Sequence, residues 1–236
     1  MISKEDSSVI SDKLKFWFGP LVVLIVTAAI GAKAQAQMSK MYGTVGLTSN
    51  YVDRGITQSK KGPSLNAGMG YWFGPQGRIG FEGASVAYQN ESTSVEMRLL
   101  TDYKFVFTQA TDFKIRVDWV RYFSENIRSK LIATLDLNLF TYHVLASRED
   151  NFEGTKRPRN WFALHKDWAY TQSVQINGTV GYSMPEGYDS YFDTRIGASY
   201  LMTNITVGVF NTYVSKAQQF GGTADTAFLL ELQARF

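Results

Sequence analysis

Charged side chains alternate with apolar ones through the middle of the chain, and this spacing sets which chemistry the sequence can support. In the stretch SVEMRLLTDYKFVF, residues 94–107, the charges fall on even positions and the odd positions are almost all apolar. Residues of one parity lie on one face of a strand, so the charges of neighbouring strands would share a face. The charged residues that this pattern places together as a candidate lining of an interior are Glu82, Glu96, Arg98, Asp102, Lys104, Lys114, Arg116, Asp118, Lys130, Asp136, Asp193, Arg195, Glu231 and Arg235.

This set is balanced, with seven acids and seven bases. A pore that strongly prefers cations or anions carries an excess of one sign along its path. Neighbouring charges of opposite sign on one face of a sheet instead form cross-strand ion pairs. We therefore expect these side chains to fill or narrow the interior, and a narrow path for solutes is the alternative.

Catalytic and metal-binding groups are sparse. The chain has two histidines and no cysteine, which excludes thiolate nucleophiles, thiolate metal sites and disulfides and argues against a multi-histidine metal site. His143 with Ser147 and Glu149 is the one local grouping that hints at a nucleophile and base, but His143 falls on the odd, outward parity. His165 has no defined partner. The sequence predicts no enzymatic activity, no cofactor and no bound metal.

Apolar residues recur with a period of two along the rest of the chain, and a helical period is nowhere sustained. Many of these segments reach ten or more residues, which exceeds the usual strand of a globular protein and matches the ~9–11 residues of a tilted membrane-spanning strand. The predicted strands lie within residues 41–52, 64–73, 78–88, 94–107, 113–120, 130–140, 161–183, 188–201, 204–215 and 224–236. Aromatic residues collect near strand ends, as membrane interfaces favour: Tyr51, Tyr71, Trp72, Phe73, Phe105, Phe107, Trp119 and Tyr122.

These features predict an all-β fold, an antiparallel up-and-down transmembrane β-barrel of about ten strands, within a range of roughly eight to twelve. The region 142–173 leaves the count open, because it can hold a long loop with one strand or with two. Its loop also falls on the side that strict alternation assigns to short turns. A soluble β-sandwich alternates in the same way, with its charged face in water, and is the alternative.

The N-terminal segment is organised like a secretory signal peptide. Lysines precede the apolar stretch 16–32, and a small-x-small pattern ending at Ala36 follows it. The apolar stretch is shorter than the ~20 residues of a membrane-spanning helix and contains a glycine and a proline, which argues against a permanent anchor. We expect cleavage after Ala36, so that residues 1–36 form the signal peptide and residues 37–236 the barrel.

The first predicted strand runs into a compact polar motif that a Gly-Pro pair follows. The motif residues are Ser49, Asn50, Tyr51, Arg54, Gly55, Thr57, Gln58 and Ser59. With this motif, the stretch 45–72 resembles the Gcw_chp family of proteobacterial exported proteins of uncharacterised function. The resemblance implies a signal peptide and an outer-membrane-type β-barrel, and it brings no substrate, reaction or binding residue.

Within this motif, Gly55 and Arg54 have definable physical roles. Glycine adopts a positive φ without steric cost, so Gly55 can redirect the chain. The Arg54 guanidinium can bind a carboxylate or loop carbonyls. We expect a loop that is pinned by hydrogen bonds of Arg54 and Gln58, and a ligand contact at the barrel mouth is the alternative.

The signal peptide and the barrel pattern together predict a protein of the Gram-negative outer membrane that is first secreted to the periplasm. Its expected partners are outer-membrane lipid, the barrel assembly machinery and a possible small solute. The formal net charge is +3, and no basic run is interleaved with aromatics, which argues against nucleic acid as a partner.

The interior pattern favours a narrow channel or small-solute transporter, or a structural barrel without transport. The alternatives are an exported binding or adhesion module that acts through the loops 53–63 and 146–159, and a soluble periplasmic β protein.

The chain ends in FLLELQARF, which alternates to its last residue with Phe236 on the apolar face. This ending resembles the C-terminal signal that the outer-membrane assembly machinery recognises. We expect the substitution Phe236→Ser to impair membrane insertion more than its lost apolar burial explains, measured as the heat-modifiable fraction on a gel. Phe228→Ser, on the same face of the same predicted strand, is the control. Unchanged assembly of the Phe236→Ser variant would contradict the assignment.

Overall fold

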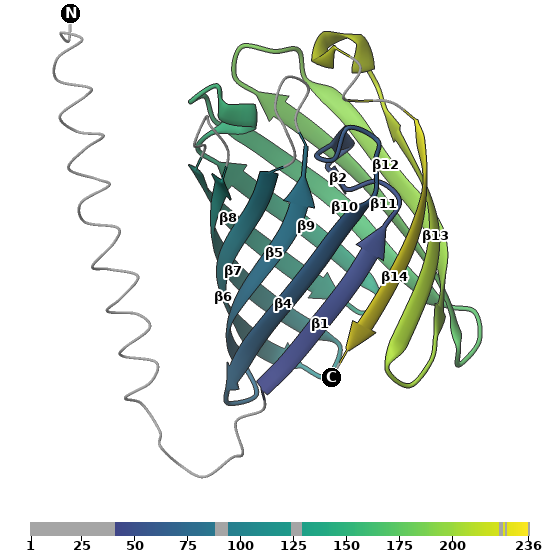
Figure 1. Cartoon of the computed structure of the whole chain (residues 1–236). Coiled ribbons are helices and arrows are strands. Elements are labelled where there is room, and N and C mark those ends of the chain that lie inside the picture. Colours follow the sequence, from purple (N-terminus) through teal and green to yellow (C-terminus); the bar gives the residue numbers. More distant parts are fainter. Residues whose placement is uncertain (1–40, 88–93, 124–128, 222–223, 225, 236) are drawn as a thin grey trace, which may run out of the picture. The chain divides into compact units, whose positions relative to one another are not determined.

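The strands of this protein form a closed antiparallel barrel (Figure 1). The computed structural model describes residues 41–87, 94–123, 129–221, 224 and 226–235. The barrel strands are β1 (Met41–Thr48), β4 (Ser64–Phe73), β5 (Gly77–Val86), β6 (Ser94–Thr108), β7 (Thr111–Phe123), β8 (Ser129–Leu139), β9 (Tyr142–Glu149), β10 (Arg159–Ala169), β11 (Val174–Pro185), β12 (Tyr191–Leu201), β13 (Ile205–Val214) and β14 (Ala227–Arg235). A separate hairpin joins β2 (Val52–Asp53) to β3 (Ile56–Thr57), and the loops carry the 3₁₀ helices η1 (Phe152–Gly154) and η2 (Ala217–Phe220). The fold class predicted from the alternation is confirmed.

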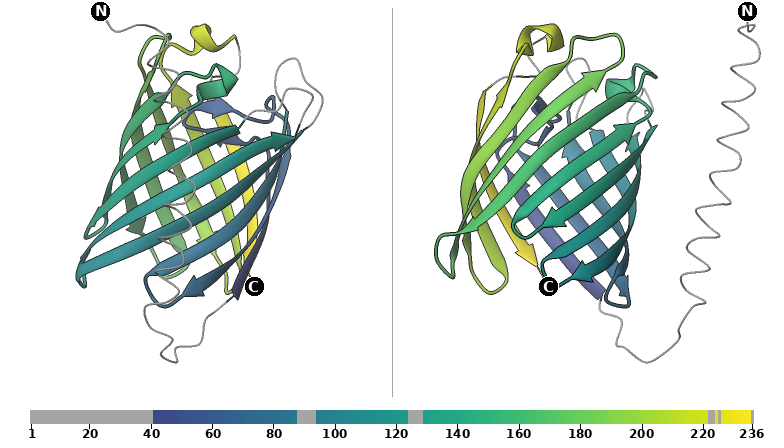
Figure 2. Two further views of the ribbon diagram at one scale, coloured as in Figure 1. Left: turned by 90° about the vertical axis from the view of Figure 1, so that its left-hand side faces the viewer. Right: turned by 180° about the vertical axis from the view of Figure 1, so that it is seen from behind.

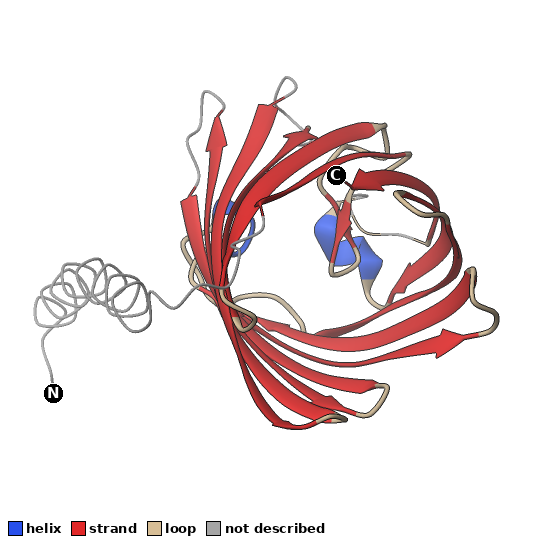
Figure 3. Ribbon diagram, turned by 90° about the horizontal axis from the view of Figure 1, so that it is seen from below, coloured by secondary structure: helices blue, strands red, loops and turns tan. Residues whose placement is uncertain are grey.

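The barrel closes because β1 pairs with β4 on one side and with β14 on the other. Leu47, for example, lies opposite Leu65 of β4 and Leu232 of β14. Seen from below, the strands enclose the interior as a ring (Figure 3). Closure leaves no open sheet edge, which is the condition for a sheet to stand in lipid. Phe236 itself lies outside the described residues.

The barrel has twelve strands, two more than the central prediction and within the predicted range. Both extra strands come from the region 142–173. β8 and β9 are joined by a two-residue turn in which Phe140 has a φ of 62°, and β10 and β11 are joined at residues 170–173. Neither turn contains a glycine or proline, so the two strongest turn signals are missing there.

With these two turns included, the connections between strands alternate between the two ends of the barrel. Short turns of β4–β5, β6–β7, β8–β9, β10–β11 and β12–β13 gather at one end of the barrel, the turn end (Figure 2). Longer connections, including residues 150–158, gather at the opposite end, the loop end. The loop that appeared to lie on the wrong side therefore lies with the other long loops. In outer-membrane barrels the short turns usually face the periplasm.

The outer surface of the barrel is apolar. Large hydrophobic side chains are exposed around it, among them Leu65, Phe81, Leu99, Ile115, Leu135, Leu164, Val180, Ile196, Val209 and Leu230. Exposed aromatics lie near both ends of the strands, with Tyr103, Phe105 and Phe107 toward the turn end and Trp119 and Phe123 toward the loop end. No helix among the described residues is long and apolar enough to cross a membrane.

Three of the aromatics predicted for the interfaces lie elsewhere. Tyr122 is 3% exposed on the inner side of β7, and Tyr51 hydrogen-bonds to Glu96 within the interior. Trp72 packs against Tyr42, whose ring lies over Gly70 of the neighbouring strand. A Cβ atom at Gly70 would come within 2.4 Å of that ring, so the close approach requires glycine. Tyr122 and Trp72 have the parity of the inner face of their strands, so nearness to a strand end did not decide which face they occupy, and Tyr51 lies in the loop, where alternation does not apply.

Candidate functional site

The connection between β1 and β4, residues 49–63, crosses the barrel interior at the loop end, and we call it the mouth loop. Its side chains reach strands far from β1 in the sheet order: the Tyr51 hydroxyl lies 3.3 Å from Glu96 of β6, and Arg54 lies 3.2 Å from Glu149 of β9. Ile56 forms an isolated bridge with Ala224, before β14. The loop is therefore attached to several walls of the mouth at once.

Asn50 organises the mouth loop from within. Its side-chain oxygen accepts a hydrogen bond from the Thr57 hydroxyl. The backbone N–H of Tyr51 donates to Ser59 Oγ over 2.9 Å, and that of Gln58 donates to the Tyr51 carbonyl over 2.7 Å. At the other end of the motif, Ser49 exchanges hydrogen bonds with the backbone of Leu230 in β14. The polar motif residues thus satisfy one another and anchor the loop to the closing strand.

The tip of the loop requires glycine. Gly55 has a φ of +83°, as predicted, and a Cβ atom there would lie 2.1 Å from Val214 Cγ2. Its neighbour Arg54 also has a positive φ, of 48°. This turn directs the Arg54 side chain toward the wall formed by β9 and β10.

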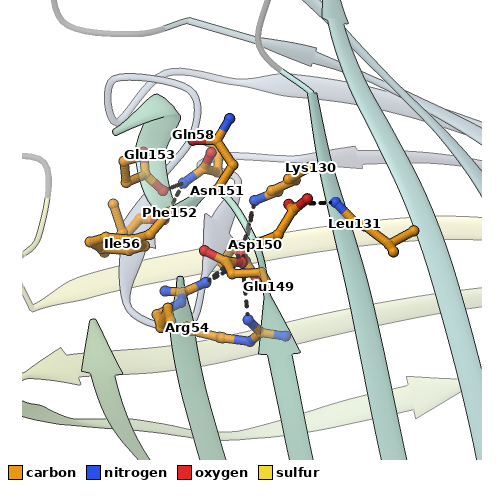
Figure 4. A network of polar contacts seen from close by, with 12 residues as sticks. Arg54, Ile56, Gln58, Lys130, Leu131, Glu149, Asp150, Asn151, Phe152 and Glu153 are labelled. Carbon is orange, nitrogen blue, oxygen red and sulfur yellow. Dashed lines mark hydrogen bonds and ion pairs between the residues drawn. The ribbon is translucent and has the colours of Figure 1, made fainter. Parts of the chain in front are cut away.

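Five charged residues meet where the mouth loop touches that wall, namely Asp53, Arg54, Lys130, Glu149 and Arg159, and we call them the mouth cluster. Figure 4 shows Arg54 and Lys130 of this cluster beside Glu149. Glu149 Oε2 lies 3.0 Å from Arg159 Nη2, 3.2 Å from Arg54 Nη1 and 3.7 Å from Lys130 Nζ. Asp53 Oδ2 lies 3.3 Å from Arg159 Nη2. The side chains of Glu149 and Arg159 have no exposed surface. One buried carboxylate therefore holds cations from the loop and from two wall strands.

Aromatic side chains surround the mouth cluster. The Arg159 guanidinium stacks 4.7 Å from the Phe152 ring, and that of Arg54 lies 4.9 Å from Trp161. The Tyr191 hydroxyl accepts a hydrogen bond from Arg159 Nη1 over 3.0 Å. A core of fully buried apolar residues closes the same region: Ile56, Phe152, Tyr191, Val214 and Ala224. These rings exclude water and strengthen the ion pairs.

Two carboxyl groups at the mouth, those of Asp53 and Glu153, have pKa values that differ from the ordinary ones. Burial disfavours the charged form of Asp53, but the positive charges of Arg54, Lys130 and Arg159 outweigh it and hold the pKa of this carboxyl below its usual range. Burial raises the pKa of Glu153, and nearby cations oppose this only in part. Glu153 accepts a hydrogen bond from Gln58 Nε2 over 3.3 Å. Both motif side chains that were expected to pin the loop thus contact carboxyl groups outside it, Arg54 that of Glu149 at the end of β9 and Gln58 that of Glu153 in η1.

The candidate lining residues predicted from the alternation lie on the inner face of the strands, and many of them form ion pairs. Lys114 with Asp136 and Arg195 with Glu231 join different strands, at 2.9 Å and 2.8 Å. Other pairs join neighbours on one strand, as in Glu96 with Arg98 and Arg116 with Asp118, both at 2.8 Å. Asp102 pairs with Arg78 of β5, which has the parity of the polar face but is not among the candidate lining residues. No ion pair is recorded for Glu82 or Lys104 among the described residues.

Two cavities lie inside the barrel, and Tyr51, Asn66 and Gln233 line both of them. One, of about 190 Å³, is also lined by Thr44, Glu82, Glu96 and Arg98. The other, of about 210 Å³, is also lined by Thr48, Arg195, Ser199, Thr206, Phe210 and Glu231. Their walls offer hydroxyl, amide, carboxylate and guanidinium groups, which can hydrogen-bond a small polar solute.

The expectation that His143 faces outward is wrong. His143 lies opposite Asn138 of β8 and His165 of β10, and its ring contacts the inward carboxylate of Asp136 at 2.9 Å. The unrecognised turn after β8 shifts the parity of β9 by one, which exchanges its faces. Ser147 shares the inner face with His143, but four residues of strand separate them by roughly 13 Å, so the two cannot form a nucleophile–base pair.

Sequence reasoning placed Lys130 of the mouth cluster on the inner face but missed Glu149 and Arg159. Glu149 and Arg159 end β9 and begin β10, within the stretch that was expected to be a loop. The signal that could have located them is the alternation of YHVLASRE, which resumes after Phe140 with its faces exchanged. Asp53 lay beside the motif, but no sequence feature indicated its partners.

No family model matches this sequence, and no curated protein matches it. Solved structures do resemble it. The KdgM porin is 12% identical, with a TM-score of 0.53 over 84% of this chain and 99% of that chain. The chain has the fold of an outer-membrane β-barrel. The KdgM porin in complex with disordered oligogalacturonate gives the same identity and coverage with a TM-score of 0.52. At this identity the likeness concerns the fold alone, and the resemblance of residues 45–72 to the Gcw_chp family stays a prediction.

Neutralising Glu149 should release the mouth loop. Glu149→Gln leaves the cations of the cluster with Asp53 as their remaining carboxylate, and breaking a buried ion pair costs roughly 3–5 kcal/mol. The chain has no cysteine, so Ile56→Cys, at a side chain 1% exposed, provides a single thiol reporter. We expect thiol labelling to be slow in the Ile56→Cys background and at least ~100-fold faster when Glu149→Gln is added.

Asp189→Asn is the matched control, because it breaks the exposed ion pair with Lys216 at the same end of the barrel. This variant should leave the labelling rate unchanged. Equal rates in the Glu149→Gln variant and this control would show that the mouth cluster does not hold the loop.

The attachment of the mouth loop should depend on pH in two opposite ways. Glu153 has a raised pKa in the folded cluster, so attachment should strengthen as pH falls through that pKa toward the ordinary value of about 4.3. Asp53 has a lowered pKa, so its contribution is complete above about pH 3.9 and is lost as pH falls toward the folded-state pKa. We expect labelling of Ile56→Cys, normalised to that of the exposed Asp189→Cys, to slow from neutral pH to mild acid and to accelerate in stronger acid.

Glu153→Gln tests the first of these two effects separately. It should abolish the slowing in mild acid and keep the acceleration in stronger acid. A normalised rate that does not change with pH would contradict both assignments.

Proposed function

We propose that this protein is an outer-membrane β-barrel that conducts small polar solutes through a narrow interior, which the mouth loop constricts at the loop end. The apolar outer surface supports a place in lipid, and the predicted signal peptide supports export to the periplasm and delivery by the barrel assembly machinery. The observation that carries the proposal is the pair of cavities inside the closed barrel, beside the mouth loop, with charged and hydrogen-bonding groups in their walls.

The charges of the interior favour weak ion selectivity. Among the residues that the structure describes, acids and bases of the inner wall neutralise one another in pairs and form no ring of one sign. The KdgM structure contains oligogalacturonate, but that ligand belongs to a protein only 12% identical. For this chain we propose uncharged or zwitterionic solutes of small size.

A structural barrel without transport is the second candidate. The ion pairs of β6, β7 and β8 fill part of the interior, and the mouth loop is held by a buried cluster. A binding or adhesion module is less well supported, because the mouth loop turns inward and residues 150–158 pack on it. A soluble periplasmic protein would have to expose the apolar outer surface to water. We propose no enzymatic activity.

Planar-bilayer recording of purified, refolded protein separates the first two candidates. We expect small and infrequent conductance steps from the natural chain, with K⁺ and Cl⁻ permeabilities of similar size. Glu149→Gln should open the constriction and give larger and more frequent steps, whereas the control Asp189→Asn should behave as the natural chain. Absence of unitary conductance from both the natural chain and Glu149→Gln would remove the channel and leave the structural barrel.

A further inference from the structure

The two histidines of this 236-residue chain lie directly opposite each other on neighbouring strands. His143 belongs to β9 and His165 to β10, and both face the interior near the turn end. Their ring centroids are 5.7 Å apart with an interplanar angle of 64°. About a quarter of each side chain is exposed, so ions in the interior can reach the rings. This pairing lies at the end of the barrel opposite the mouth cluster.

Each ring is oriented by a partner at Nδ1. Asp136 Oδ1 lies 2.9 Å from His143 Nδ1, and the other oxygen of Asp136 lies 2.9 Å from Lys114 Nζ. Thr179 Oγ1 lies 2.8 Å from His165 Nδ1. A carboxylate that accepts a hydrogen bond from Nδ1–H fixes the tautomer and leaves the Nε2 lone pair of His143 available. This is the arrangement in which histidine usually binds a metal ion.

The separation of the rings suits a shared ion. Two imidazoles bound to one tetrahedral metal through Nε2, at about 2.0–2.1 Å, have ring centroids roughly 5 Å apart. The observed 5.7 Å is reached from that value by a small rotation of either side chain. Asp167 Oδ2 lies 3.3 Å from His165 Nε2, which places a carboxylate beside the same nitrogen.

We propose that His143 and His165 bind one divalent transition-metal ion through their Nε2 atoms, with Asp167 and water as further ligands. Among the described residues, no three histidine, cysteine, aspartate or glutamate side chains are gathered into a ready-made metal cage. The site therefore takes the ion by moving Asp167 from hydrogen-bonding distance of His165 into the coordination sphere. This proposal does not rest on the channel function.

The donor set defines the class of ion. Imidazole nitrogens suit Cu²⁺, Ni²⁺ and Zn²⁺, and affinities of such sites rise toward Cu²⁺. Mg²⁺ and Ca²⁺ prefer sets of oxygen ligands and would gain little from two imidazoles. Zn²⁺ is the most direct probe because it accepts tetrahedral geometry and has no redox chemistry.

Isothermal titration of Zn²⁺ into refolded protein in detergent tests the proposal, with a chain that carries no histidine tag. We expect one Zn²⁺ per chain and no detectable binding of Mg²⁺. His143→Ala and His165→Ala should each weaken Zn²⁺ binding at least tenfold, and the double variant should abolish it. Asp136→Asn should weaken it by roughly 10–100-fold, because that carboxylate orients His143 without touching the ion. Glu82→Gln, an inward carboxylate on β5, is the control and should bind Zn²⁺ normally.

Folding of each variant is verified by its heat-modifiable mobility on a gel. Unchanged Zn²⁺ binding by a folded double variant would assign the ion to carboxylates elsewhere and overturn the proposal. Absence of Zn²⁺ binding by the natural chain would overturn it as well and leave the histidines as wall-filling residues.

Discussion

Backbone pairing between β1 and β14 is the constraint on which the rest of this structure depends. In lipid, an unpaired N–H or C=O group costs several kcal/mol, so the sheet has to close on itself. Closure gives every strand one face toward the outside and one toward the interior. The alternation of apolar and polar residues then follows along each strand, and a shift by one residue would exchange the two faces.

Closure also encloses the charged side chains of the inner face within the barrel. Charges taken out of water are costly unless they are paired, and the inner wall pairs them along and across its strands. The mouth cluster is the most deeply buried example of this pairing. Glu149 has no exposed side-chain surface, and it is matched by Arg54 from the loop and Arg159 from the wall. Removing any one member leaves the others uncompensated, so the loop and the wall are held as a unit.

The fold was largely predictable from the sequence, and most errors of the prediction come from two turns that contain neither glycine nor proline. Strand length and alternation predicted a closed transmembrane barrel and the inward direction of the charged residues. The turn at Phe140 was missed because a non-glycine residue adopts its positive φ. That omission reduced the strand count, hid Glu149 and Arg159 in a supposed loop, and turned His143 to the wrong face. The missed turn at residues 170–173 accounts for the other additional strand, and the turn at Phe140 also exchanged the predicted faces of β9, because a shift by one residue exchanges the two faces of a strand.

The sequence by itself determined the class of fold, the face on which each charge lies in most strands, and the local role of Gly55. Those properties depend on residues close together along the chain, where spacing and φ preferences act. Only the tertiary structure decided which residues meet: Arg54 with Glu149, and His143 with His165. Such contacts depend on strand order, register and the path of a loop across the mouth. These are set by closure of the whole barrel, and no local pattern in the sequence records them.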